Sequence, residues 1–97
     1  MHSSFDRADL LSVLKRCREL TSRSDDSDWS CMDVKDLSKN LDDAIQRLEN
    51  SMPVEIKFLR FLFVVTGPLQ ETSLSNGWAE EFLVLAELFD KIVGESP

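Results

Sequence analysis

Side chains that could perform chemistry are few in this sequence and lie far apart. The chain of 97 residues has two cysteines, Cys17 and Cys31, and one histidine, His2. The cysteines do not form a C-x-x-C motif and have no clustered histidines beside them, so zinc and dithiol redox motifs are absent. A histidine at the second position is poorly placed to act as a general base for a nucleophile. We therefore expect no enzyme activity, no metal and no cofactor.

A run of acidic residues after the first predicted helix resembles part of a calcium-binding loop. The sequence from Asp25 reads DDSDWS, and hard cations take oxygen ligands from closely spaced carboxylates. Counted from Asp25, however, the sixth position is Ser30 and not the glycine of a sharp turn. The twelfth position is Asp36 and not a bidentate glutamate. The spacing indicates a solvated acidic loop without calcium.

An acidic surface is the best candidate for a binding site. Trp29 lies among the loop carboxylates, and an aromatic anchor surrounded by charge suits an interface with a basic partner. Trp29 could instead fold back onto the core, and the sequence leaves both interpretations open. Part of the charge further along is expected to pair internally, for example Lys39 with Asp43 or Asp43 with Arg47. The candidate partner-binding residues are Asp25, Asp26, Asp28, Trp29, Asp33, Asp36, Asp42 and Asp43.

The net charge argues against nucleic acid as the partner. Eleven basic side chains oppose eighteen acidic ones, which gives a formal charge of −7 that repels a phosphate backbone. Residues 1–24 carry five basic and three acidic side chains, so the acidity belongs to the rest of the chain. A basic first segment beside acidic neighbours also has a structural explanation, because opposite charges favour docking between helices.

Apolar residues recur at helical spacing in most of the chain. Leu10, Val13, Leu14, Cys17 and Leu20 follow the i, i+3, i+4 pattern, which predicts a first helix near residues 5–20. The polar segment 21–28 is expected to be a loop. A second helix is predicted near 33–50, with a start like a capping box at Ser30 and Asp33.

The segment after Pro53 is ambiguous. Residues 54–58 alternate like a strand, but no other segment offers an edge with which a strand could pair. We interpret 53–65 as a third helix that has Pro53 in its first turn and ends at Thr66-Gly67-Pro68. Residues 69–75 are expected to form a connection anchored by Leu69 and Leu74.

A fourth helix is predicted from Trp78 to Gly94, with one apolar face that places Trp78 in the core. The result is one all-α domain over residues 1–97, a compact four-helix bundle. The most apolar stretch, Phe58 to Val65, is too short to cross a bilayer. The N-terminal segment lacks the pattern of a secretory signal, so we expect a cytoplasmic protein without a membrane partner.

One stretch carries a resemblance to a known family. Residues 80–89, EEFLVLAELF, resemble the late helix of colicin D-type immunity proteins, in which a Glu-Glu pair, an Ala-Glu pair and a final Phe recur at this spacing. The acidic, helical character of the chain is also similar to that of helical immunity proteins of bacteriocin and contact-dependent inhibition systems. This resemblance implies an inhibitor that covers the basic active site of a nuclease toxin with an acidic face.

Two hypotheses of different classes follow. The first is a non-enzymatic immunity protein or antitoxin that binds a basic protein through the acidic surface, as a monomer or weak homodimer. The alternative is a small helical adaptor or structural module that acts through self-association or through an apolar groove. That groove is expected near Phe61, Phe63 and Leu69.

Overall fold

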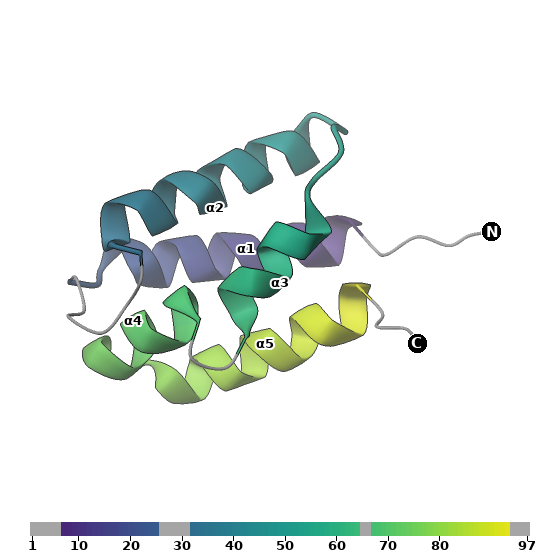
Figure 1. Ribbon diagram of the computed structural model, residues 1–97. Helices are drawn as coiled ribbons and strands as arrows, with labels where there is room; N and C mark the ends of the chain where they lie inside the picture. Colours follow the sequence, from purple (N-terminus) through teal and green to yellow (C-terminus); the bar gives the residue numbers. More distant parts are fainter. Residues whose placement is uncertain (1–6, 26–31, 65–66, 94–97) are drawn as a thin grey trace.

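Five α-helices make up the fold in the computed structural model, which describes residues 7–25, 32–64 and 67–93 (Figure 1). No strand occurs within these ranges. The predicted all-α class and compact helical bundle are confirmed. The four predicted helices correspond to α1, α2, α3 and α5, and α4 is an additional short helix. The helices are α1 (Arg7–Ser22), α2 (Val34–Glu49), α3 (Ile56–Phe63), α4 (Pro68–Asn76) and α5 (Ala79–Val93).

The first two helices form where their apolar spacing predicts them. All five apolar residues of the predicted α1 face are buried, and α1 extends two residues further than expected because Thr21 is also buried. Asp33 is the N-cap of α2, since its side chain accepts a hydrogen bond from the backbone N–H of Asp36. The predicted capping box from Ser30 to Asp33 is therefore wrong in its register, because Asp33 is the N-cap itself and not the third residue of the helix. Ser30 lies outside the described residues.

The prediction that Pro53 begins the third helix is wrong. Residues 52–55 are not helical, and α3 begins at Ile56 with Glu55 as its N-cap. Arginine side chains hold this link by its carbonyl groups: Arg7 donates to Met52 O at 2.6 Å and Arg47 to Pro53 O at 3.4 Å. Ser51, in the left-handed region with φ 58°, turns the chain away from the end of α2.

The predicted connection at residues 69–75 is also wrong, because this segment forms most of α4. Pro68 occupies the first turn of α4, and Gly77, with φ 82°, ends the helix. Leu69 is buried as expected, but the predicted anchor Leu74 is 58% exposed. Two of the four buried residues of α4 are Thr72 and Ser73, so the apolar pattern that marks a helix is incomplete in this part of the sequence.

Gly67 is required at the turn between α3 and α4. A Cβ atom at this position would lie 2.7 Å from the carbonyl oxygen of Phe61 and 2.9 Å from that of Val64. These contacts are with backbone atoms, which cannot move aside as a flexible side chain would. The tight turn brings α4 alongside α3 and leads the chain back towards α5.

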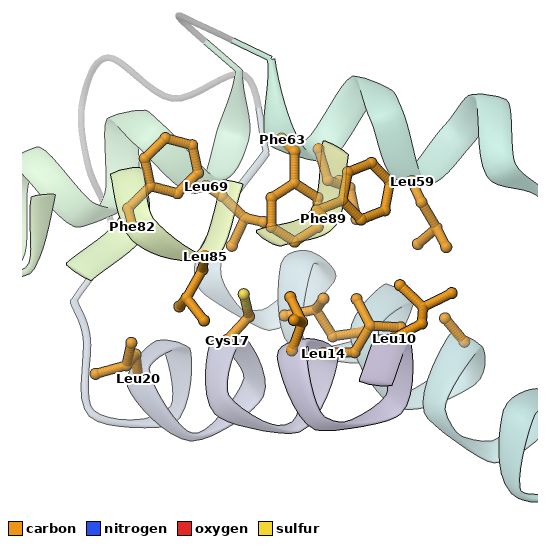
Figure 2. Close-up of a cluster of buried hydrophobic side chains, with 14 of the residues drawn as sticks. Leu10, Leu14, Cys17, Leu20, Leu59, Phe63, Leu69, Phe82, Leu85 and Phe89 are labelled. Carbon is orange, nitrogen blue, oxygen red and sulfur yellow. The ribbon is translucent and has the colours of Figure 1, made fainter. Parts of the chain in front are cut away.

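The core lies between α1, α2 and α5, with α3 and α4 covering it (Figures 1 and 2). Phe63 of α3 stacks on Phe89 of α5 with ring centroids 4.3 Å apart, and its ring is 6.3 Å from that of Phe82. Leu14 and Cys17 of α1 face these helices and are fully buried. Trp78 is only 9% exposed, which confirms its predicted place in the core.

Candidate interaction surface

The described acidic residues proposed for partner binding lie in three places on the molecule. Asp33 and Asp36 are at the start of α2, and Asp42 and Asp43 are in its middle. Asp25 lies just beyond α1, and all five side chains are exposed. The remaining candidates fall outside the described residues, namely Asp26, Asp28 and Trp29.

Asp25 is held to the end of α4 by its backbone. The Asn76 side chain accepts a hydrogen bond from Asp25 N–H at 2.9 Å and donates one to Asp25 O at 2.9 Å. The neighbouring Ser24 hydroxyl accepts a hydrogen bond from Trp78 Nε1 at 2.8 Å. The beginning of the acidic loop is therefore anchored where α4 passes into α5, and the Asp25 carboxylate is left without an ion-pair partner among the described residues.

The carboxylates at the start of α2 also serve the helix itself. Asp33 Oδ1 accepts from Asp36 N–H at 2.8 Å, which satisfies one of the backbone donors at the helix N-terminus. Negative charge at this end is further stabilised by the helix dipole. Both side chains remain exposed, so they can face a partner while they hold the end of the helix.

The two carboxylates in the middle of α2 have partners within the chain. Arg18 Nε of α1 lies 2.7 Å from Asp42 Oδ1, and Arg47 Nε lies 2.9 Å from Asp43 Oδ2. The pairing of Asp43 with Arg47 that the sequence predicts is confirmed. Asp42 and Asp43 are 55% and 63% exposed, so these pairs lie at the surface, where ion pairs are weak.

The basic residues in the middle of α1 are paired with neighbouring carboxylates. Lys15 lies 3.0 Å from Glu49 of α2, and Arg16 donates two hydrogen bonds to Glu81 of α5, one of them at 2.9 Å. The hydrogen bonds from Arg16 hold the pKa of the Glu81 carboxyl below its usual value. The structural explanation of the basic first segment, docking by opposite charges, is thus confirmed.

This pairing leaves an excess of carboxylates on the surface. Within residues 7–25, 32–64 and 67–93, the side chains that follow are exposed or partly exposed and have no ion-pair partner. They are Asp25, Asp33, Asp36, Glu55, Glu71, Glu80, Glu87 and Asp90. The unpaired negative charge is therefore spread over the end of α1, the start of α2, the segment before α3, α4 and α5. At the start of α2 it is partly offset by Lys35 and Lys39, which are exposed and also have no ion-pair partner among the described residues.

A second feature, which the sequence analysis did not predict, is the exposed side of α5. Leu83, Val84 and Leu88 are 58%, 56% and 42% exposed. The unpaired carboxylates of this helix lie beside them at helical spacing, and we call the six residues together the α5 outer face: Glu80, Leu83, Val84, Glu87, Leu88 and Asp90. A signal was present in the sequence, because these three apolar residues do not fit the single apolar face assigned to this helix.

The described residues also form a cavity of about 280 Å³ between α2 and the segment before α3. Arg47 lines this cavity and donates hydrogen bonds to the Asp43 carboxylate and to the Pro53 carbonyl oxygen. Val54 and Phe58 contribute apolar side chains to the lining. Its lining holds no histidine, cysteine or hydroxyl that could act as a nucleophile or a general base alongside the carboxylates. The lining of this cavity therefore gives no reason to assign it a catalytic role.

Cys17 lacks the properties of a reactive thiol. Its side chain is fully buried, and burial raises the pKa of the thiol to about 12, so the thiolate does not form at neutral pH. Cys31 lies outside the described residues. Among the residues that the structure covers, no group of three metal-ligating side chains comes together.

The prediction of an apolar groove near Phe61, Phe63 and Leu69 is wrong. Phe63 and Leu69 are buried in the core, so they cannot line a groove that is open to a partner.

Comparisons with models of known protein families, with curated proteins and with solved structures found no match for this chain. None of the described helices combines the length and the apolar character needed to cross a bilayer. A functional interpretation therefore depends on the surface of the molecule, on its charge pairing and on the exposed apolar side chains of α5.

Proposed function

We propose that this protein is a non-enzymatic inhibitor of the immunity or antitoxin type, which neutralises a basic, nuclease-type toxin through an acidic surface. The observation that supports this proposal best is the distribution of ion pairs. The cations near the middle and end of α1 pair within the molecule, one of them with Glu81 of α5, so they leave the carboxylates at the start of α2 and the other carboxylates of α5 without an ion-pair partner. A field of this sign attracts a cationic protein and accelerates its association.

The test is binding to a candidate toxin, namely a protein with a basic terminal domain encoded beside this chain. Association is followed by stopped-flow fluorescence, and inhibition by nuclease activity. Raising the ionic strength from about 0.01 M to about 0.15 M shortens the Debye length from about 30 Å to about 8 Å. We expect the association rate to fall about tenfold or more over this range. An association rate independent of salt would contradict the proposal.

Charge removal tests where the toxin binds. Asp25→Asn, Asp33→Asn and Asp36→Asn remove three negative charges, and asparagine still caps a helix, so α2 should remain intact. We expect slower association and weaker inhibition for this triple variant. Glu55→Gln is the matched control, since Glu55 is unpaired and exposed but lies beyond the opposite end of α2. Equal losses in both variants would argue against a localised site.

A small helical adaptor is the second candidate function, and the exposed apolar side chains of α5 favour it. The proposed groove at Phe63 and Leu69 does not support it, because both residues are buried. Sedimentation velocity over a wide concentration range separates the two candidates. An inhibitor of the proposed kind stays monomeric or dimerises weakly, while a self-associating module forms dimers at low concentration.

A further inference from the structure

Helix α5 is apolar on two sides, although only one side faces the core. Phe82, Leu85 and Phe89 are buried against the other helices. Leu83, Val84 and Leu88 of the α5 outer face are about half exposed, as large as core residues but in contact with solvent. Scattered single apolar residues on a surface need no explanation, whereas a cluster on one helix face marks an interaction site.

The spacing gives this cluster the length of a small docking patch. Residues 83 to 88 span about 7.5 Å along the helix axis, at 1.5 Å per residue. Val84 and Leu88 lie on successive turns along one line of the helix, and Leu83 lies about 100° around the helix from Val84, one turn before Glu87. A patch of this length fits the apolar stripe of a partner helix, which presents its anchors at positions i, i+3, i+4 and i+7.

The charges around the patch select the partner. Glu80, Glu87 and Asp90 have no ion-pair partner among the described residues. Lys91 is exposed on the same side of α5, one turn after Glu87, so this side carries three negative charges and one positive charge. Two copies of this face would bring like charges together, which opposes self-association through it. An anionic lipid surface would be repelled for the same reason. A segment that is both apolar and positively charged matches the exposed apolar side chains of this face and its net negative charge.

We propose that the α5 outer face binds a basic amphipathic helix of a partner protein. Apolar side chains of that helix cover Leu83, Val84 and Leu88, and its lysine or arginine residues pair with the flanking carboxylates. This deepens the function proposed above and rests on it for the identity of the partner. The start of the acidic loop is anchored near the N-terminal end of α5, because Asp25 is bound to Asn76, the last residue of α4.

The surface can be tested without any toxin. The probe is a synthetic 14-residue helical peptide, about four turns long, that carries leucine at helical spacing on one side and lysine on the other. It is titrated into the isotopically labelled protein, and amide chemical shifts and calorimetric affinity are recorded. We expect the shift changes to cluster in residues 80–91. A peptide of the same composition with dispersed leucines should bind at least tenfold more weakly.

Matched variants show whether the exposed apolar residues carry the binding. Leu83→Gln, Val84→Gln and Leu88→Gln together should weaken peptide binding about tenfold or more, because glutamine keeps the helix but removes the apolar contact. Leu74→Gln on α4 is the control, since Leu74 is as exposed as Leu83. Its affinity should stay within about twofold of the parent. Circular dichroism checks that each variant is folded.

Several results would overturn this inference. Peptide binding unaffected by the triple variant, or shift changes confined to the start of α2, would exclude the α5 outer face. A dimer of the unliganded protein that the triple variant abolishes would show that a second copy covers this face. Peptide binding at α5 without neutralisation of any toxin would contradict only the proposed function. Full neutralisation of the toxin by the triple glutamine variant of α5 would contradict only the binding role proposed for the α5 outer face.

Discussion

Helices α2 and α5 have similar lengths but present different surfaces to solvent. The buried residues of α2 lie on one side, and none of its large apolar side chains is exposed. Helix α5 buries an equivalent side and still exposes Leu83, Val84 and Leu88. The two helices also differ in charge pairing. Three of the four carboxylates of α2 are in ion pairs, whereas on α5 only Glu81 of its four carboxylates is paired.

This difference separates what the fold needs from what it does not need. A helix with one apolar face satisfies the bundle completely, and α2 has the sequence of such a helix. The outer side of α5 adds nothing to the core, yet it keeps apolar residues that water solvates poorly. Folding therefore does not account for these residues, whereas the proposed partner helix would.

The largest expected effect distinguishes the two sides of α5. Phe89→Ala removes a fully buried ring stacked on Phe63 and should lower the free energy of unfolding by about 3–5 kcal/mol. Leu88→Ala, one residue earlier on the outer face, should change it by about 0.5 kcal/mol or less. Urea denaturation of both variants measures the difference. A similar loss in Leu88→Ala would show that this face is already buried in solution.

On α2, a buried and an exposed position should differ in their effect on the free energy of unfolding nearly as much as Phe89 and Leu88 do on α5. Leu41→Ala empties a fully buried position and should cost about 2–5 kcal/mol of unfolding free energy. Lys39→Ala, on the outer side, should stay within about 0.5 kcal/mol of the parent. The helices would then differ in binding and not in stability. Chemical denaturation of the two variants tests this. A large loss of unfolding free energy in Lys39→Ala would show that Lys39 makes a stabilising contact, contrary to its exposed position.

The sequence predicts these buried positions but not the whole fold. Helices α1 and α2 are predictable because one apolar face determines each of them. Helix α4 is not, because Thr72 and Ser73 occupy its buried side and its start depends on the turn at Gly67. The start of α3 depends on carbonyl contacts of Arg7 and Arg47 with the preceding link, which local patterns do not encode.

The candidate surface is predictable in a similar, partial way. The acidic excess and the pairing of Asp43 with Arg47 follow from residues close in sequence. The pairs of Arg18 with Asp42 and of Arg16 with Glu81 join residues of different helices, so only the packed bundle reveals them. The exposed apolar residues of α5 were not predicted, because the sequence analysis assigned a single apolar face to this helix. Leu83, Val84 and Leu88 do not fit the helical spacing of that face, so the sequence did contain the signal.

A smaller effect is expected at the start of α2, where a candidate binding residue also caps the helix. Asp33→Ala removes the acceptor for Asp36 N–H and should cost about 1 kcal/mol of unfolding free energy. Asp33→Asn keeps the cap and should cost a few tenths at most. Thermal and urea unfolding measure both. If the two variants are equally unstable, the charge at this position contributes more than the hydrogen bond.

The smallest effect concerns the ion pair that joins α5 to α1. Because Arg16 holds the pKa of Glu81 below its unfolded value, Glu81 stabilises the fold above that unfolded value, near pH 4.5. This contribution is lost as the pH falls through the lowered, folded-state pKa. Both side chains are more than one-third exposed, so the effect is small and weakens with salt. Glu81→Gln should therefore flatten the acid limb of stability against pH, and Arg16→Gln should flatten it to a similar extent. The double variant should add little to either single change, and full additivity would show that the two residues act independently. Unfolding curves from pH 2 to 7 provide the measurement.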